Sequence, residues 1–247
     1  MNVLVLVAME TERSAILSRF PLVKVRHRLP LGLAAHRIAR GSSNVYLAGA
    51  GVGTANAAAA TAVLAEKLSL DAVLLLGVGG SLSSSLEIGD TVVASRILQH
   101  DCRLTLDGGR SEFMAPGELH LSLSPELRPS PFIPVDPIWR DWLTRAAGGR
   151  AVAGLLLSGN EFVGSASRKA ELAKLAPDAL LVDMEAAGVA QIARKLGLPF
   201  GAAKTVSDRL SPGVSVTADY ATFLAKAAEN SSRIFARLLA DPPPRSI

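Results

Sequence analysis

The stretch Leu180-Leu181-Val182-Asp183-Met184-Glu185 opens a strand–helix–strand unit that closes on Lys204-Thr205-Val206-Ser207-Asp208. The apolar part of each stretch predicts a buried strand, and the segment 184–196 between them predicts a helix. Glu185 stands at the start of that helix and Asp208 at the end of the second strand, so neither acid belongs to a solvated run of charge. Because open α/β sheets place their sites at strand ends, the unit predicts an α/β fold and marks where its chemistry lies.

The same alternation of strand and helix runs through the rest of the chain. Strands are expected at 3–7, 24–29, 33–39, 44–48, 72–76, 90–95 and 151–157, and helices at 10–20, 54–68, 139–147, 165–175 and 220–239. Such alternation favours a parallel central sheet. The stretch 102–137 is rich in Pro, Gly, Ser and charge and predicts a long loop or lid with hairpin-like pieces at most. No linker divides the chain, so we expect one domain over 1–240 and a disordered tail over 241–247.

Composition argues against several classes of protein. Hydrophobic residues make up 49% of the chain and aromatic residues 4%, which suits close packing of helices on a sheet. The formal net charge of +4 comes from scattered Lys and Arg residues, and this argues against nucleic-acid binding. Cys102 is the single cysteine, so no intrachain disulfide or cysteine-based metal site is expected, and a reducing cytoplasm is the natural setting. No apolar run approaches the roughly 18 residues of a membrane span.

The sequence lacks the motifs of dinucleotide binding, of metal binding and of serine hydrolysis. The Gly-rich segments 49–53 and 77–80 are interpreted as turns after strands, which either pack closely or offer backbone N–H groups to a ligand. Neither makes the dinucleotide fingerprint. The four histidines are scattered, so no metal site is indicated, and Ser158 lacks the flanking glycines of a hydrolase elbow.

Carboxylates remain as the candidate chemical groups. Five acids follow predicted strand ends: Glu10, Glu12, Asp183, Glu185 and Asp208. Each alone could be a helix cap or an ion-pair partner. Their convergence at strand ends, with Phe162 between two of those ends, favours a ligand site.

Six motifs, in a fixed order along the chain, contain the candidate acids, Phe162 and the Gly-rich segments. They are Ala8-Met9-Glu10-Thr11-Glu12, Gly49-Ala50-Gly51-Val52-Gly53, Gly77-Val78-Gly79-Gly80-Ser81-Leu82 with Glu87-Ile88-Gly89-Asp90, Ser158-Gly159-Asn160-Glu161-Phe162, Val182-Asp183-Met184-Glu185-Ala186 and Val206-Ser207-Asp208. Through them the chain resembles the purine nucleoside phosphorylase and 5′-methylthioadenosine/S-adenosylhomocysteine nucleosidase superfamily, on its nucleosidase side. The resemblance covers almost the whole chain and is weakest between 102 and 150. It implies a single-domain three-layer α/β/α fold with a central mixed, mostly parallel twisted sheet, and a homodimer.

The resemblance also implies roles for three acids. Glu12 looks like the general base that activates water, Glu185 beside Met184 like the residue that holds the ribose hydroxyls, and Asp208 like the acid at the purine N7. Cleavage of an N-ribosidic bond builds positive charge on the sugar and negative charge on the departing base. A carboxylate must therefore face the sugar and a proton must meet the base. This requires Glu12 to be ionised and Asp208 to carry or share a proton.

The remaining pocket residues are likewise implied by the resemblance. Phe162 resembles the aromatic that stacks on the purine, Val163 would offer it backbone groups, and Val52 and Tyr220 fall where the family lines its pocket for the 5′ substituent. Further residues expected to bind substrate are Met9, Val78, Gly79, Asp183 and Ser207. An Asp at position 208, rather than Asn, favours a 6-aminopurine such as adenine, because one carboxyl can serve both N7 and the exocyclic amine.

Three positions depart from the usual pattern of the nucleosidases. Val78 replaces a serine, Asp183 a longer Glu, and Lys204 an Arg. These changes concern the substrate more than the reaction, and they could mark a specialised branch such as futalosine hydrolase or the phosphorylase-like protein that removes adenine from adenosylhopane.

We therefore expect a cofactor-free hydrolase that releases adenine from a 5′-substituted adenosine. Glu12 argues for water as the nucleophile, since phosphorolysis needs cations and N–H donors around a phosphate co-substrate. Arg13, Arg28 and Arg110 could reach a phosphate, but no motif assigns them. Two alternatives stay open: a phosphorylase of the same fold, and a nucleoside-binding module without turnover.

Overall fold

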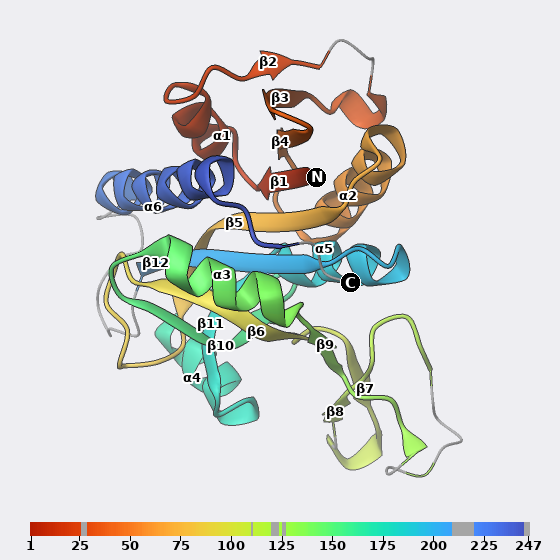
Figure 1. The fold of residues 1–247 in the computed structure, drawn as a ribbon. Coiled ribbons are helices and arrows are strands. Elements are labelled where there is room, and N and C mark those ends of the chain that lie inside the picture. The colour runs from red at the N-terminus through yellow and green to blue at the C-terminus, as the bar shows by residue number, and fades with distance from the viewer. Residues whose placement is uncertain (26–28, 110, 120–123, 125–126, 209–219, 245–247) are drawn as a thin grey trace.

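A large mixed sheet with helices on both faces forms the centre of the protein (Figure 1). The computed structural model describes residues 1–25, 29–109, 111–119, 124, 127–208 and 220–244. The strands of the large sheet are β1 (Asn2–Val7), β2 (Val23–Lys24), β3 (Ala35–Arg40), β4 (Ser43–Gly49), β5 (Ala72–Ser81), β6 (Thr91–Gln99), β9 (Phe132–Pro134), β10 (Ala151–Ser158), β11 (Ala179–Asp183) and β12 (Phe200–Asp208). The helices are α1 (Glu10–Leu17), α2 (Thr54–Leu68), α3 (Pro137–Ala147), α4 (Ala166–Leu175), α5 (Ala186–Lys195) and α6 (Tyr220–Ala240).

The sheet runs in the order β11-β10-β6-β12-β5-β1-β4-β3-β2, and β9 pairs with β6. Its longest central pairings, β12 with β5 and β10 with β6, are parallel. The end of β5 also pairs with β11 in the antiparallel sense, so the sheet curls back on itself there. This curl brings the ends of β5, β11 and β12 together, which is where the predicted acids stand.

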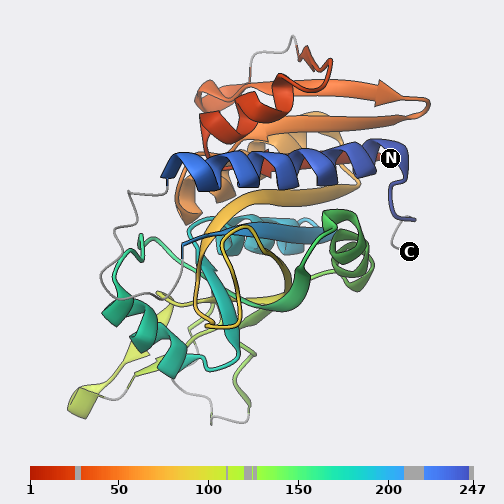
Figure 2. The same ribbon diagram turned by 90° about the vertical axis from the view of Figure 1, so that its left-hand side faces the viewer.

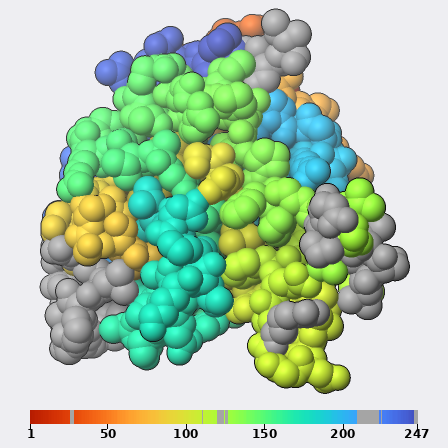
Figure 3. Space-filling view, turned by 90° about the horizontal axis from the view of Figure 1, so that it is seen from below, coloured from red at the N-terminus to blue at the C-terminus, as the bar shows by residue number. Residues whose placement is uncertain are grey.

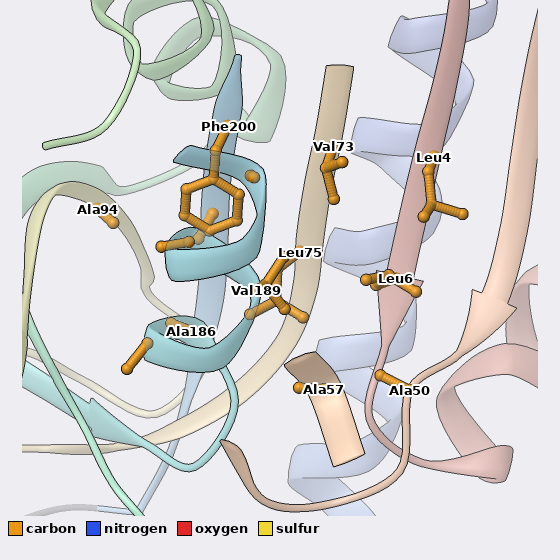
Figure 4. Packing of buried hydrophobic residues seen from close by; sticks show 14 of the residues in the cluster. Leu4, Leu6, Ala50, Ala57, Val73, Leu75, Ala94, Ala186, Val189 and Phe200 are labelled. Atoms are coloured by element: carbon orange, nitrogen blue, oxygen red, sulfur yellow. The ribbon is translucent and has the colours of Figure 1, made fainter. Parts of the chain in front are cut away.

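Two hydrophobic layers cover the two faces of the sheet (Figures 1 and 2). Helices α1, α3 and α6 pack on one face, where Trp139 and Phe235 are fully buried. Helices α2 and α5 pack on the other face, where Ala57 and Val189 meet Leu6 and other strand side chains (Figure 4). Successive residues of a strand point to opposite faces. The continuous apolar run in β1 therefore feeds both layers, and the predicted three-layer α/β/α fold with a mixed sheet is confirmed.

Two glycines allow backbones to approach closely near the strand ends. A Cβ on Gly188 of α5 would lie 2.2 Å from the carbonyl oxygen of Thr54 at the start of α2. A Cβ on Gly79 of β5 would lie 2.2 Å from Leu181 Cδ2 and 2.8 Å from the carbonyl oxygen of Val182. The first contact lets the N-termini of α2 and α5 converge, and the second permits the β5–β11 pairing.

Some local expectations were wrong. Gly77 to Gly80 lie inside β5, which continues to Ser81 instead of ending in a turn, because β11 supplies a second partner for the end of this strand. In the stretch 102–137, the hairpin of β7 (Arg103–Thr105) and β8 (Ser111–Phe113) agrees with the hairpin-like pieces expected there. The pairing of β9 with β6, which joins this stretch to the main sheet, was not expected. Seen from below, this hairpin and α4 project on the same face (Figure 3). Of the strand expected at 24–29, only Lys24 lies in β2, and 26–28 lie outside the described residues.

Candidate active site

One cavity collects nearly all of the predicted site residues at the carboxyl ends of β1, β5, β11 and β12. Its lining includes Met9, Glu12, Val52, Val78, Gly79, Phe162, Val163, Asp183, Met184, Glu185, Ser207 and Asp208, together with Ala8, Gly80, Glu161, Val182 and Lys204. Tyr220 begins α6, but its side chain lies outside the described residues. The segments that resemble one family thus form a single site, although they are spread over 200 residues of sequence.

Glu12 is held by the first turn of α1 and is buried. Its Oε2 accepts a hydrogen bond of 2.9 Å from the backbone N–H of Met9, which fixes the direction of the carboxylate. Its Oε1 is buried and has no hydrogen-bond partner among the described residues. Burial raises the pKa of Glu12, although Lys204 and the Met9 N–H act in the opposite direction. A buried carboxylate with one uncommitted oxygen is suited to accept a proton.

A buried lysine connects three acids of the cavity: Glu12, Asp183 and Glu185. Lys204 Nζ lies 2.8 Å from Asp183 Oδ2 and 3.0 Å from Glu185 Oε2, and its side chain is 1% exposed. Burial alone would favour the neutral amine, but the carboxylates of Asp183, Glu185 and Glu12 outweigh it and raise the pKa of Lys204. Lys204 is therefore a fixed cation among three carboxylates. Two of the three departures found in the sequence, Asp183 and Lys204, are partners in one ion pair.

The start of α5 fixes Glu185 and Asp183. The carboxylate of Asp183 accepts from the backbone N–H of Ala186 at 3.2 Å, so it caps the helix as well as pairing with Lys204. Glu185 is the N-cap residue of α5, and its Oε1 accepts from the backbone N–H of Gly53 at 3.3 Å. Glu185 is thus held between α2 and β12, and Met184 lines the cavity beside it.

Asp208 stands at the end of β12 with 17% of its side chain exposed. Its Oδ1 lies 2.7 Å from the Ser207 hydroxyl, which also lies 3.0 Å from the carbonyl oxygen of Gly79. Its Oδ2 forms an ion pair with the ammonium group of Lys169, which comes from α4. The acid predicted at the purine N7 is therefore paired with a buried cation.

The loop after β10 supplies the apolar edge of the cavity. Phe162 is 72% exposed and Val52 is 47% exposed, so both can be covered by a ligand. Arg168 binds both carboxylate oxygens of Glu161 and holds the pKa of that acid low. Asn160 Oδ1 accepts from the backbone N–H of Thr54 at 2.9 Å, which ties this loop to the start of α2.

Lys169 and Asn160 were not identified from the sequence as site residues. A signal for Lys169 was present, since it stands three residues before Leu172 and shares the buried face of α4 with it. A lysine on the apolar face of a helix needs a partner, because buried charges are paired. Asn160 gave no comparable signal, because its role is to join two loops that are distant in sequence.

Neither a metal cluster nor a membrane span was found in the described part of the chain. Its His, Cys, Asp and Glu residues form no group of three or more that could hold a metal ion. None of its helices combines the length and apolar character needed to cross a membrane.

Comparison with known proteins gives the family. The model of the phosphorylase superfamily matches residues 2–240. A 5′-methylthioadenosine/S-adenosylhomocysteine nucleosidase of Staphylococcus carnosus is 30% identical over 205 residues, which is 80% of this chain and 82% of the relative. The crystal structure of the Neisseria meningitidis nucleosidase of that name, in complex with methylthio-immucillin-A, has a TM-score of 0.79 at 29% identity and covers 96% of this chain and 98% of that chain.

The fold is also shared with a protein from the branch considered above. Native futalosine hydrolase of Helicobacter pylori has a TM-score of 0.80 at 24% identity and covers 98% of both chains. At that identity the likeness concerns the fold alone. Together with the family match, which spans almost the whole sequence, these comparisons show that the chain belongs to the phosphorylase superfamily.

Proposed function

We propose that the chain is a purine nucleoside N-ribosyl hydrolase that releases adenine from a 5′-substituted adenosine, of the methylthioadenosine or adenosylhomocysteine kind. The proposal agrees with the names of its relatives, 5′-methylthioadenosine/S-adenosylhomocysteine nucleosidases. The observation that carries it is Glu12, whose buried Oε1 has no partner among the described residues and which lines one cavity with Glu185 and Asp208. The reaction proposed needs no cofactor.

In the proposed reaction, the C1′–N9 bond breaks and its electron pair leaves with the purine. Glu12 takes a proton from water as the water oxygen bonds to C1′. Glu185 binds the ribose hydroxyls, and its contacts with the Gly53 N–H and Lys204 support this role because they hold the carboxylate at the cavity. Asp208 serves N7 and the exocyclic amine of the base. Phe162 stacks on the purine, and its exposed ring is available for that contact.

The charge of the cavity supports water rather than phosphate as the nucleophile. Lys204 is the cation of the lining in the described residues, and it lies between Asp183 and Glu185. Arg13 pairs with Glu10 at 2.7 Å. Arg28 and Arg110 lie outside the described residues. A phosphate dianion placed beside Glu12 would face three carboxylates and a single ammonium group, which is unfavourable.

Base release from a panel of adenosines tests the proposal. Methylthioadenosine, adenosylhomocysteine, adenosine and an adenine nucleoside with a bulky apolar 5′ group are incubated with and without phosphate, and adenine, free ribose and ribose 1-phosphate derivatives are measured. Adenine with the free sugar, independent of phosphate, is expected. A phosphate requirement with the sugar 1-phosphate as product would instead establish a phosphorylase. Binding of adenosine analogues without any base release would establish a binding module.

Two variants test the assigned groups. Glu12→Gln and Asp208→Asn are each expected to lower kcat by about 10²–10⁴-fold, the usual contribution of a general acid or base. Asp141→Asn, an exposed acid on α3, is the matched control and should keep full activity. Full activity of Glu12→Gln would remove the assigned base, and full activity of Asp208→Asn the assigned acid.

We also propose a homodimer, a cytoplasmic location and a single domain over 1–240 with a disordered tail over 241–247. The dimer rests on the resemblance, the single domain on the lack of a dividing linker in the sequence, and the location on the single cysteine, Cys102. Size-exclusion chromatography with light scattering measures the oligomeric state, and a mass near that of one chain of 25.7 kDa would contradict the dimer.

A further inference from the structure

Lys169 is a buried cation behind the candidate acid. It lies in the first half of α4, on the face that also buries Leu172, and is 2% exposed. Its ammonium group forms an ion pair with Asp208 Oδ2, and its Cε lies 3.3 Å from the position of a Cβ on Gly80. Lys169 does not belong to the cavity lining, whereas Asp208 and Gly80 do. It therefore reaches the site through Asp208.

The contacts of Asp208 indicate which atoms hold protons. A buried ammonium group is stable when it is paired with a carboxylate, so the Lys169–Asp208 pair contains ionised Asp208 in the resting protein. The single Ser207 hydroxyl proton can go to Asp208 Oδ1 or to the carbonyl oxygen of Gly79, which lie 2.7 and 3.0 Å away. With Asp208 ionised, Ser207 can donate to it. With Asp208 protonated on Oδ1, Asp208 can donate to Ser207, and Ser207 to Gly79.

An ionised Asp208 has no proton of its own to give to a departing base. We infer that Lys169 holds the proton that Asp208 transfers to the purine, so that the acid of this site is the Lys169–Asp208 pair. The inference rests on the proposed function. Lys169 does not line the cavity, so it acts through Asp208: it positions that carboxylate and supplies the proton to it.

Each proton that moves in the proposed step has a named donor and a named acceptor. As the C1′–N9 bond breaks and its electrons pass to the purine, Lys169 gives a proton to Asp208 Oδ2 and Asp208 gives one to N7. Glu12 meanwhile takes a proton from the attacking water, whose oxygen bonds to C1′. The step leaves a neutral Lys169 amine and a protonated Glu12. After the products depart, Glu12 loses its proton to solvent and Lys169 regains one.

Among the described residues, the other charged groups of the cavity lining are engaged with partners of their own. From the loop before α4, Glu161 lines the cavity and is bound by Arg168, which also pairs with Glu171 on the helix. The other charged residues of the lining, Glu12, Asp183 and Glu185, cluster with Lys204. Among the described residues, Lys169 is thus the cation that forms an ion pair with Asp208.

The pH dependence of kcat distinguishes a proton-holding role from a structural one. With Lys169 as the store of the proton, the kcat of the wild-type protein for adenine release should not fall as the pH rises from 5 to 8. Lys169→Met leaves Asp208 to take its proton from solution, and its kcat should fall about 100-fold at pH 8 and much less at pH 5. Lys169→Arg keeps a cation beside Asp208, but guanidinium does not give up its proton, so it should fold like the wild type yet lose activity at pH 8.

Lys174→Met, an exposed lysine on the same helix, is the matched control and should leave the profile unchanged. A second measurement separates proton supply from folding. A 4-nitrophenyl riboside with the same 5′ group has a leaving group that departs without a proton, so Lys169→Met should cleave it at close to the wild-type rate. Equal losses on both substrates would overturn the inference.

A wild-type kcat for adenine release that falls as the pH rises from 5 to 7 would also overturn the inference, and this measurement needs no variant. These outcomes are distinct from failure of the proposed function, in which the wild-type protein releases no base from any nucleoside.

Discussion

Replacement of Lys204 by methionine is the sharpest test of how the site is held together. Methionine has a similar length, so the substitution removes the ammonium group without creating a large cavity. It leaves Glu12, Asp183 and Glu185 buried without their shared cation. Glu12 belongs to α1, whereas Asp183 and Glu185 lie where β11 leads into α5. Their mutual repulsion should open the ends of β11 and β12.

The magnitude follows from the two ion pairs. At separations of 2.8 and 3.0 Å from Asp183 and Glu185, an effective dielectric constant of about 20 gives an attraction of about 5–6 kcal/mol for each pair. Much of this offsets the desolvation of Lys204. Loss of one partner of a buried ion pair typically costs about 3–5 kcal/mol, and that range is expected for Lys204→Met. In a chain of this size it lowers Tm by roughly 6–20 °C.

Thermal and urea unfolding at pH 7.5 and pH 5 measure the effect. The deficit should be smaller at pH 5, because carboxyl groups that have lost their cation can take up protons as the pH falls. Lys67→Met is the matched control: Lys67 pairs with Glu66 on the surface of α2, and its loss should cost less than about 1 kcal/mol. If the free energy of unfolding of Lys204→Met lies within about 1 kcal/mol of the wild-type value, as expected for a surface pair, this account is refuted. A deficit that does not change with pH would refute the charge argument specifically.

Three further predictions follow from the site and its frame. Burial raises the pKa of Glu12 in the folded protein, so the stability associated with its protonated form is lost as the pH rises from about 4.5 through the raised value. Glu12→Gln should therefore raise Tm at pH 8, with a gain that fades toward pH 4, and an unchanged Tm at pH 8 would contradict this. Gly188→Ala places a Cβ 2.2 Å from the Thr54 carbonyl oxygen and should cost about 1–3 kcal/mol in urea unfolding; an unchanged midpoint would show that α2 and α5 can move apart freely. Phe162→Ala should raise KM for the adenine nucleoside with little change in Tm, because the ring is 72% exposed, and a KM equal to that of the wild type would exclude it as the stacking residue.

The architecture could be predicted because strand and helix periods differ in the sequence. Runs such as Val3 to Val7 are apolar at every position, which is typical of strands covered on both faces, and helices were expected between them. Apart from the strand expected at 24–29 and the longer β5, the structure has those elements within a few residues of the expected bounds. The path of β5 could not be predicted, because Gly77 to Gly80 satisfies the pattern of a turn. Pairing with two strands that are distant in sequence, β12 along Gly77 to Gly80 and β11 at its end, makes that segment a strand.

The contents of the cavity could be predicted largely because they follow strand ends. Its internal contacts could not. Asp183 and Lys204 were each expected to affect the substrate, yet their side chains meet each other. Lys169 was missed because it reaches Asp208 from a helix that precedes that acid by 39 residues. Ion pairs between elements that are distant in sequence leave no periodic signal within either element.

The ion pair changes how the departures from the nucleosidase pattern should be interpreted. Asp is one methylene shorter than the usual Glu, and Lys presents a compact ammonium group where Arg presents a planar fork. A fork suits bidentate contact with one carboxylate, whereas an ammonium group with three N–H donors can serve several oxygens at once. Lys204 contacts both Asp183 and Glu185 in this way. The two departures are therefore parts of one rearranged contact that keeps Glu185 in place, and Val78 is left as the departure that changes the cavity lining on its own.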